Sequence, residues 1–364
     1  MKVTGIIVEY NPFHNGHRYH IEKARESTHP DVLAAVMSGN FCQRGDISII
    51  DKFQKTQAAL ENGVDLVIEL PYIDTVQNAY AFGYKAVSLL DRIHADHLVF
   101  GSETNNLEEL KQYASLEIDV TRLKELLHDG HSYPKAYGLL AGSLYPNDIL
   151  AVTYLKALQK TKIVPVSIQR TNSFQSTEMA PVASARAIRE AVKRKEDYSL
   201  STPVTISEPL YIDQFYPLIR SLLITLPEEE LSQIFLMSEG IENLLKKNAL
   251  KYWDYEQFMD ASISRRYTRS RLQRILLHLL GHVTKEEVQE LEKEDYLRIL
   301  GFNERGQELL KSLRKEEDIR IITQFKKLPE RQKALEWKMA QLYASLMKDP
   351  QAYIRKELKG PLIY

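Results

Sequence analysis

The stretch that decides the fold reads VTGIIV at residues 3–8 and continues as EYNPFHNGH at residues 9–17. The first six residues are uncharged and mostly apolar, which is typical of a strand covered on both faces. Pro12 stiffens the turn that follows, and His14 and His17 stand three residues apart where a helix would begin. A helix start presents unpaired backbone N–H groups and the positive end of the helix dipole, so this place favours an anion such as phosphate.

The rest of the first half repeats this alternation of strands and helices. Short apolar runs occupy residues 32–37, 64–70, 97–101 and 163–168, and helical patterns lie at residues 53–61, 80–90 and 107–127. Strands that alternate with helices imply right-handed crossovers and a doubly wound parallel sheet. The sequence therefore predicts a Rossmann-like α/β domain whose ligands bind at the carboxyl ends of its strands.

The second half has a different pattern. Strand signals stop after about Ser201, and residues 210–354 follow a helical pattern nearly throughout. The run Ser201-Thr202-Pro203 is typical of a boundary between domains. We expect a nucleotide-binding α/β domain at residues 1–200 and an α-helical domain at residues 201–364.

Composition limits the class of protein. Of the 364 residues, 44% are hydrophobic and 27% are charged, and the single cysteine, Cys42, excludes a disulfide framework and a four-cysteine zinc site. No apolar stretch approaches the about 18 residues that span a membrane. We expect a cytoplasmic protein with no membrane partner, whose oligomeric state the sequence leaves open. The 48 basic and 49 acidic residues give a net charge of −1, which by itself argues against a nucleic-acid partner.

The histidine pair suits phosphoryl chemistry. His14 and His17 could donate hydrogen bonds to phosphate oxygens during an in-line displacement and lower its barrier electrostatically. Gly16 has no Cβ, so a phosphate or a base could approach the backbone closely. The alternatives are two histidines satisfied locally at a helix start, or a zinc site. No third ligand stands at a fitting spacing, so we expect no metal held by the protein. His20, one turn later, fits a structural role.

A basic cluster lies in the second half. Residues 261–275 contain no acid and five arginines: Arg265, Arg266, Arg269, Arg271 and Arg274. An apolar stripe that starts at Leu272 turns Arg274 away from the core, and the other arginines lie at its edge or near the helix start. They could pair with RNA phosphates, with Tyr267 stacked on a base. Lys246, Lys247 and Lys251 could extend this surface. A solvated helix face would show the same pattern.

Two smaller features lie between the second and third predicted strands. Asp51 and Lys52 stand just before a predicted helix, where we interpret them as a cap and a surface residue. Cys42 has no neighbour that would activate it as a nucleophile, and we interpret it as a small packed residue near the site.

The residues also resemble a known family. The H-x-G-H pattern after the first strand resembles that of the nucleotidyltransferase superfamily. Longer strings resemble the bacterial tRNA(Met) cytidine acetate ligase family. These strings are GIIVEYNPFHNGHRYHI, MSGNFCQRG, ALENGVDLVIELP, FGSE, PNDILAVTYLKAL, YTRSRLQRILLHLLG and YLRILGFNERG. The resemblance is therefore nearly as long as the chain.

The resemblance implies an ATP-dependent ligase. Such an enzyme activates acetate as acetyl-adenylate, releases pyrophosphate and acetylates N4 of the wobble cytidine, position 34, of elongator tRNA(Met). Mg²⁺ is expected as the counter-ion of the phosphates. Two alternatives stay open at this point: an adenylyltransferase that acts on a small phosphorylated metabolite, and a non-catalytic RNA-binding protein. The long helical half argues against the first, and the intact His14, Gly16 and His17 argue against the second.

The resemblance also implies site residues. His14 and His17 would be catalytic. The segment that would wrap ATP is Ile7, Val8, Glu9, Tyr10, Asn11, Pro12, Phe13, His14, Asn15, Gly16, His17, Arg18, Tyr19 and His20. Further ATP contacts are expected from Gly101, Asn147, Arg170, Ser184 and Arg189. The alternatives are a turn glycine for Gly101, helix caps for Asn147 and Ser184, and a surface ion pair for Arg170.

This chain departs from the family pattern in two places. Arg186 stands where the family usually has threonine, which puts one hydroxyl contact in doubt. Ser173-Phe174-Gln175 replaces the family's usual aromatic residue and histidine, so we assign no role to these three. The expected tRNA-binding residues are Arg265, Arg266, Arg269, Arg274, Lys246 and Lys247.

Overall fold

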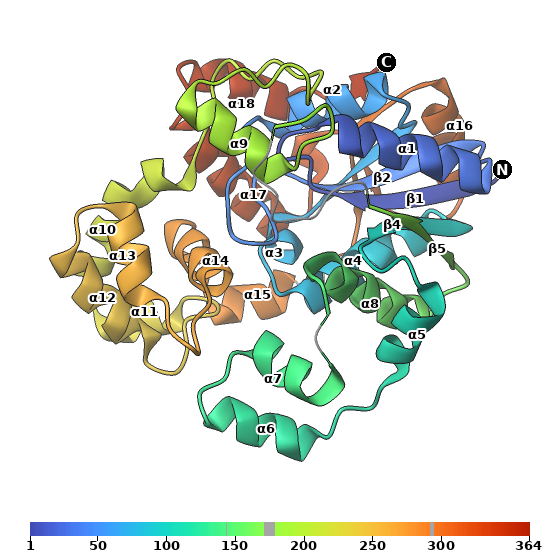
Figure 1. Cartoon of the computed structure of the whole chain (residues 1–364). Coiled ribbons are helices and arrows are strands. Elements are labelled where there is room, and N and C mark those ends of the chain that lie inside the picture. The colour runs from blue at the N-terminus through green and yellow to red at the C-terminus, as the bar shows by residue number, and fades with distance from the viewer. Residues whose placement is uncertain (143, 171–178, 292–294) are drawn as a thin grey trace.

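The computed structural model describes residues 1–142, 144–170, 179–291 and 295–364. At its centre is one sheet with the strand order β5-β4-β1-β2-β3-β6-β7, and β8 pairs with β6 (Figure 1). The strands are β1 (Val3–Val8), β2 (Val32–Ser38), β3 (Leu66–Leu70), β4 (His97–Ser102), β5 (Val164–Gln169), β6 (Leu297–Phe302), β7 (Ile321–Ile322) and β8 (Leu362–Ile363). The first five strands are parallel, which confirms the predicted α/β class.

Helices cover both faces of this sheet. One face packs against α1 (Asn15–Thr28) and α2 (Lys52–Glu61), and the other against α4 (Ala79–Arg92), α5 (Leu107–Ser115), α8 (Pro146–Leu158) and α16 (Glu304–Leu313). In β2, Leu33, Ala35 and Met37 face the first layer and Val32, Ala34 and Val36 the second. Every residue of β2 is therefore buried, as the apolar run predicted.

The remaining helices form a lobe, an arm and a C-terminal layer (Figure 1). The helical lobe comprises α10 (Tyr216–Thr225), α11 (Glu228–Gln233), α12 (Ile241–Lys251), α13 (Tyr255–Ser262), α14 (Arg269–Leu280) and α15 (Lys285–Leu291). The arm comprises α6 (Val120–His128) and α7 (Tyr133–Ala141), and the other helices are α3 (Tyr72–Thr75), α9 (Ala185–Arg194), α17 (Glu330–Ala344) and α18 (Pro350–Leu358). Among the described residues, no helix has the length and hydrophobicity needed to cross a membrane.

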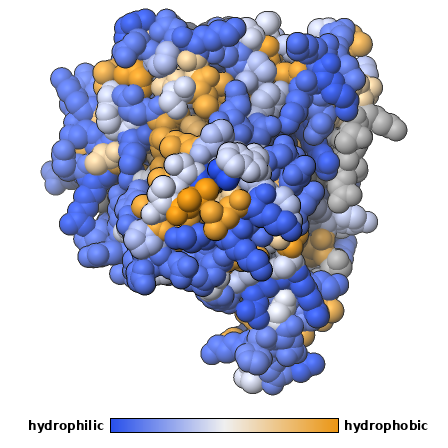
Figure 2. Space-filling model, turned by 90° about the vertical axis from the view of Figure 1, so that its left-hand side faces the viewer, coloured by the Kyte–Doolittle hydropathy of each residue, from blue (hydrophilic) through white to orange (hydrophobic). Residues whose placement is uncertain are grey.

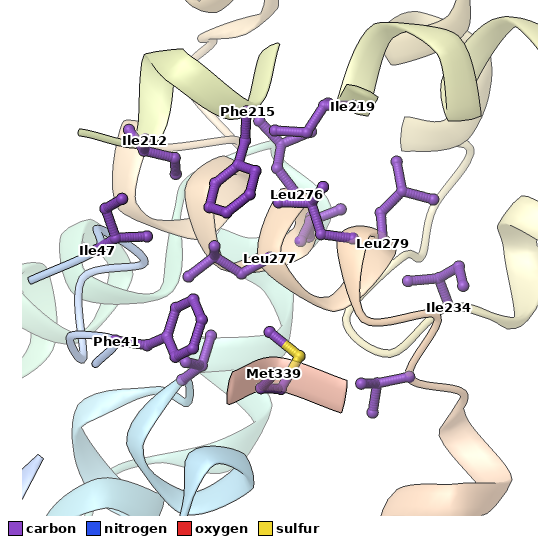
Figure 3. Packing of buried hydrophobic residues seen from close by; sticks show 14 of the residues in the cluster. Phe41, Ile47, Ile212, Phe215, Ile219, Ile234, Leu276, Leu277, Leu279 and Met339 are labelled. Atoms are coloured by element: carbon purple, nitrogen blue, oxygen red, sulfur yellow. The ribbon is translucent and has the colours of Figure 1, made fainter. Parts of the chain in front are cut away.

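The helical lobe packs directly on the loop that follows β2. Phe41 and Ile47 of this loop belong to the same buried cluster as Phe215, Leu277 and Met339, and Figure 3 shows their side chains pointing toward one another. Gly45 explains how close the approach is, because its φ is +79° and a Cβ there would lie 2.3 Å from the backbone nitrogen of Arg274. The loop and α14 therefore form one packed unit.

The expectation that strands end at Ser201 was wrong. β6 pairs antiparallel with β3, and β7 and β8 extend the sheet beside β6. The residues of β6 looked like part of a charged helix because Arg298 interrupts their apolar run. In the fold Arg298 is buried and paired, so its charge does not mark a solvent-facing side. The division into residues 1–200 and 201–364 stays a prediction, but the C-terminal part supplies strands to the common sheet.

Two local predictions also differ from the structure. The helix expected over residues 107–127 is interrupted, because α5 ends at Ser115 and Asp119 caps a new helix, α6. Asp51 caps α2 as predicted, through its side chain and the N–H groups of Phe53 and Gln54. Lys52, however, is not a surface residue: its side chain is 3% exposed.

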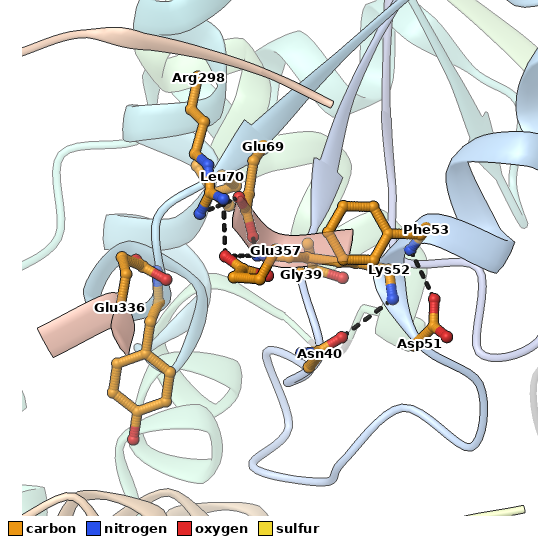
Figure 4. Close-up of polar contacts among 12 residues, drawn as sticks. Gly39, Asn40, Asp51, Lys52, Phe53, Glu69, Leu70, Arg298, Glu336 and Glu357 are labelled. Carbon is orange, nitrogen blue, oxygen red and sulfur yellow. Dashed lines mark hydrogen bonds and ion pairs between the residues drawn. The ribbon is translucent and has the colours of Figure 1, made fainter. Parts of the chain in front are cut away.

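Lys52 belongs to a buried cluster of charges that connects the sheet to the C-terminal helices (Figure 4). Its Nζ lies 2.8 Å from Glu69 of β3 and 2.9 Å from Glu357 of α18. Arg298 of β6 pairs with the same two carboxylates at 2.8 and 2.6 Å. Two cations and two anions thus neutralise each other, which is the condition under which charges can be buried.

Candidate active site

The topology places a ligand site beside the end of β1. The chain runs from β1 through β2 to β3 on one side, whereas β4 and β5 lie on the other side of β1. The strand order therefore reverses between β1 and β4, and such switch points bind ligands at the carboxyl ends of the strands. The loop that leaves β1 here is Glu9–His14, and Gly101 lies near the end of β4.

Both histidines are fixed by the first turn of α1. His14 is the N-cap, and its Nδ1 accepts a hydrogen bond from the backbone N–H of Gly16 at 3.0 Å. The backbone N–H of His14 donates in turn to Nδ1 of His17 at 3.2 Å. The two rings stack with centroids 3.7 Å apart. Gly16 is required here because a Cβ would lie 2.8 Å from the His14 ring.

These contacts determine where the imidazole protons are. Because each Nδ1 accepts a backbone N–H, the proton of each neutral ring lies on Nε2. Burial, reinforced by the charges of Arg170 and Arg189, lowers the pKa of His14 to about 3. Burial and the neighbouring His14 hold the pKa of His17 well below its ordinary value. Both rings are therefore neutral at pH 7 and carry one Nε2–H donor each.

The rest of the loop supports the histidines from below. Tyr10 and Phe13 are buried, and their rings contact His17 at centroid distances of 4.7 and 5.7 Å. The Asn11 side chain is satisfied internally, since its amide donates to Cys42 and Ile47 and accepts from Ile49. The side chains of these predicted ATP-binding residues are therefore buried and hold the loop in place. The packing of Cys42 agrees with its interpretation as a small core residue.

The flanking members of the predicted ATP segment differ in exposure. Ile7 and Val8 end β1, Pro12 is buried, Tyr19 is half-buried and Arg18 is exposed. His20 contacts the backbone oxygen of Val99 through Nε2 at 3.1 Å, which ties α1 to β4. Burial lowers the pKa of His20 to about 4. This contact agrees with the structural role that the sequence suggested.

Two arginines bring positive charge to the histidine pair. Arg170 follows β5 directly and packs against Gly101, whose absent Cβ would lie 3.1 Å from its side chain. Its Nε is buried without a hydrogen-bond partner among the described residues. Arg189 of α9 donates to the backbone oxygen of Asn11 at 2.7 Å. The structure therefore brings together His14, His17, Gly101, Arg170 and Arg189, as predicted.

The Asn147 side chain bonds to a neighbouring loop of the protein, and its predicted contact with ATP stays a prediction. Its side-chain amide donates to Glu103 at 2.6 Å, and Tyr145, not Asn147, is the N-cap of α8. The next residue, Asp148, is fully buried and accepts hydrogen bonds from Ser102 at 2.6 Å and from the backbone N–H of Glu103 at 3.0 Å. Asp148 thus shapes the end of β4. The sequence analysis missed this role, although an acid inside the apolar PNDIL run was a usable signal.

A second residue that sequence reasoning missed is Lys55 of α2. It is fully buried, and its Nζ donates to the backbone oxygens of Glu9 and Ser38, both at 2.8 Å, and to that of Gly39 at 2.5 Å. Burial lowers its pKa to about 8. Lys55 therefore joins the carboxyl ends of β1 and β2. The sequence did contain a sign of this role. Lys55 lies one helical turn before Ala59, on the apolar face of the helix, where an unpaired lysine would be costly to bury.

Residues near the predicted domain boundary at Ser201 pack against the start of α1. Asn15 donates through its side chain to the oxygens of Pro181 and Leu200, and its backbone N–H donates to Ser201. Ser184 is the N-cap of α9, as predicted, and accepts the N–H of Ala187 at 3.0 Å. Arg186 is exposed. Ser173-Phe174-Gln175 lies outside the described residues.

Most basic residues of the predicted RNA surface contact other parts of the protein. Arg265 contacts His131 of the arm, Arg266 donates to the oxygen of His128 at 3.4 Å, and Lys247 is exposed. Arg269 pairs with Glu256 at 2.7 Å. The Arg274 guanidinium turns back to the oxygen of Gln43 at 3.2 Å, and burial lowers its pKa to about 10.

Two further predictions for this surface need correction. Tyr267 cannot stack on a base, because its ring is 8% exposed and its hydroxyl donates to the backbone oxygen of Glu239. Lys246 is half-buried, and its Nζ donates to the oxygen of Leu226. Both side chains complete the lobe's packing, which the composition of the segment could not reveal.

Comparison with known proteins agrees with this geometry. Residues 1–358 match the model of the HIGH Nucleotidyl Transferase family. A tRNA(Met) cytidine acetate ligase of Limosilactobacillus reuteri is 38% identical over 350 residues, which cover 89% of this chain and 90% of that protein. One from Oceanobacillus iheyensis is 35% identical and both chains are covered to 100%. The chain belongs to the tRNA(Met) cytidine acetate ligase family of HIGH nucleotidyl transferases.

Solved structures of this family share the whole fold. Apo TmcAL of Thermotoga maritima has a TM-score of 0.90 at 31% identity, covering 100% of this chain and 99% of that one. A second T. maritima TmcAL structure, bound with α-thio ATP, has a TM-score of 0.87. The likeness therefore includes the helical lobe and the arm as well as the nucleotidyltransferase sheet.

Proposed function

We propose that this chain is an ATP-dependent ligase that forms acetyl-adenylate from acetate and acetylates N4 of the wobble cytidine, position 34, of elongator tRNA(Met) in the cytoplasm. The observation that carries the proposal is the stacked pair of neutral histidines at the N-terminus of α1, flanked by Arg170 and Arg189. The names of the relatives, and the ATP analogue bound to the T. maritima protein, support the same reaction.

The nucleotide would lie across the end of β1. Its phosphates would face the α1 N-terminus, where His14 and His17 each offer an Nε2–H. Arg170 would use its Nε, for which the described residues provide no hydrogen-bond partner. Gly101 has no side chain, so the nucleotide could lie close to β4. Arg189 and Ser184 of the α9 segment would contact the phosphates. Lys55 and Asp148 would hold the strand ends in place.

The first step would be an in-line displacement at the α-phosphate. An acetate oxygen attacks phosphorus, the bond to the bridging oxygen breaks, and pyrophosphate leaves with the electron pair. Charge builds on the phosphate oxygens during this exchange, and the two Nε2–H donors and the arginines are already oriented toward such charge. The histidines need no change of protonation because they act as donors.

The second step would transfer the acetyl group. The N4 amine of the cytidine attacks the carbonyl carbon of acetyl-adenylate, the bond from this carbon to the phosphate oxygen breaks, and AMP leaves as the amine loses a proton. The carbonyl is already activated, so the main contribution of the protein is position. The helical lobe packs on the loop that follows β2, and it could hold the tRNA near the site.

Mg²⁺ would enter this scheme with ATP. Among the described residues no group of three or more His, Cys, Asp or Glu side chains is placed to hold a metal ion. Mg²⁺ would therefore bind mainly to the phosphates and water, as it often does in phosphoryl transfer. It would neutralise charge on the leaving pyrophosphate.

Exchange of labelled pyrophosphate into ATP tests the first step without tRNA. The proposal predicts exchange that requires acetate. Exchange that requires a phosphorylated metabolite instead would support a small-molecule adenylyltransferase, and no exchange under any condition would support a non-catalytic RNA-binding protein. Either of these results would overturn the proposal.

A further inference from the structure

The helical lobe exposes a tryptophan outside the site described above. Trp253 lies between α12 and α13, and its side chain is 77% exposed. Figure 2 shows the face of the molecule on which this lobe lies, and most of this face is hydrophilic. A single exposed apolar residue is normal in proteins, so exposure alone assigns no role. The groups around Trp253 supply the second observation.

Arg220 of α10 stacks on this tryptophan. Its guanidinium carbon lies 3.5 Å from the centre of the indole ring. In the part of the chain that the structure describes, its buried Nε has no hydrogen-bond partner and its guanidinium has no carboxylate partner. The stack is a cation–π contact that fixes one face of the indole. Because Trp253 is 77% exposed, the opposite face of the ring remains open to solvent.

Lysines continue the positive charge along α12. Lys247 and Lys251 are four residues apart, so they share one face of the helix, and both are exposed. Neither forms an ion pair with any residue that the structure describes. Arg269 and Arg271, in contrast, are paired with Glu256 and Glu239. Lys251 lies two residues before the exposed indole and Lys247 lies one helical turn before Lys251, so cations without an ion pair among the described residues precede Trp253 along the chain.

We infer that Trp253, Arg220, Lys247 and Lys251 form a binding surface for an unpaired nucleotide of RNA. The base would stack on the open face of the indole, and the neighbouring phosphates would pair with the arginine and the lysines. The base must be unpaired, because bases inside a duplex stack on each other and cannot reach an aromatic side chain. The inference rests on the proposed function, whose substrate is a tRNA with loops of unpaired bases.

RNA fits this surface better than a second copy of the chain. A dimer contact through Trp253 would bring Arg220, Lys247 and Lys251 close to the same cations of the partner, and within the described part of the chain none of the three has a carboxylate partner of its own. Burying like charges together is costly. A polyanion gains from the same arrangement.

Binding of elongator tRNA(Met) to the full chain tests the inference. Trp253→Ala should weaken binding about tenfold, the scale of removing one base–aromatic stack. Trp253→Phe should keep most of the affinity, because a smaller aromatic ring still stacks. The matched control is Tyr364→Ala, an exposed aromatic residue at the C-terminus, far from α12 (Figure 1). Equal affinity of the alanine and unmodified proteins would overturn the inference.

Fluorescence gives a readout that does not depend on comparing affinities. The chain has two tryptophans, so Trp337→Phe leaves Trp253 as the only one. Titration of this variant with tRNA should quench its emission in a saturable way. Binding without quenching, or a change in emission that depends on protein concentration and needs no RNA, would overturn the inference.

The two levels of proposal fail in different ways. Acetate-dependent pyrophosphate exchange by the unmodified chain needs no tRNA, so its absence would count against the proposed reaction. Normal exchange together with unaltered tRNA binding by Trp253→Ala would count against the surface alone.

Discussion

At the residue scale, the geometry gives His14 and His17 roles as neutral hydrogen-bond donors. The spacing of the pair and its place after a strand could be predicted from the sequence, because both follow from local chain geometry. Lys55 and Asp148 could not be predicted in the same way. Their partners are backbone groups of Glu9 and Glu103, which are 46 and 45 residues distant, and only the folded sheet brings them together.

Removal of one histidine tests this role. His17→Ala should lower the rate of acetate-dependent pyrophosphate exchange by at least about 100-fold, the effect of removing one preorganised donor to a developing charge. His94→Ala is the matched control, because His94 lies at the surface, where Glu316 is its ion partner. A His17→Ala protein that keeps normal exchange would disprove the role.

The pH dependence follows from the lowered histidine pKa values. With the pKa of His14 at about 3 and that of His17 held well below its ordinary value, both rings are neutral at pH 7 and in the pH range around it. The pH profile of kcat/KM for ATP should therefore show no histidine ionisation between about pH 5.5 and 8. The ordinary pKa of histidine is about 6.5. A loss of activity below this pH that disappears in His14→Ala would contradict the claim that both histidines are neutral.

At the scale of elements, the first five strands were predicted closely because they are apolar on both faces, a local property. β6 was missed because its pairing with β3 joins distant parts of the chain and its Arg298 is neutralised only in the fold. The apolar stripe of α14 from Leu272 was also correct. The predicted exposure of the Arg274 and Lys246 side chains was wrong. Their orientation depends on hydrogen bonds to Gln43 and Leu226, which belong to other segments.

Charge reversal near the start of α14 tests the predicted RNA surface. Arg265→Glu with Arg266→Glu should weaken tRNA binding and reduce the slope of log affinity against log salt by about 0.9 for each phosphate that these arginines no longer neutralise. Arg269 is left unchanged because it already pairs with Glu256. Arg305→Glu on the exposed side of α16 is the control. If the salt dependence of the variant equals that of the unmodified chain, these two arginines do not contact the RNA.

At the scale of the whole molecule, the C-terminal segment completes the sheet. Glu357 of α18 bonds Lys52 and Arg298, so the end of the chain is joined to β6 and, through Glu69, to β3. The cost of burying the Glu357 charge is outweighed by these two cations, which hold its pKa below the ordinary value. Its contribution to stability is therefore present above about pH 4.5 and is lost as the pH falls toward the folded pKa.

Glu357→Gln tests this connection. The substitution leaves Lys52 and Arg298 buried with one carboxylate fewer, and the free energy of unfolding in urea should fall by about 3 kcal/mol. Glu26→Gln, which removes an exposed partner of Lys23, should leave the unfolding free energy unchanged within error. Equal unfolding free energies for Glu357→Gln and the unmodified protein would show that the cluster does not stabilise the fold.

In the proposed reaction, this one chain joins acetate to tRNA at the expense of ATP. The most direct measurement is transfer of labelled acetate to purified elongator tRNA(Met), followed by digestion to nucleosides and mass spectrometry of the position of the acetyl group. We expect N4-acetylcytidine at position 34, formed only when ATP and acetate are both present. Label that is absent, that lies on another nucleotide, or that appears without ATP would contradict it.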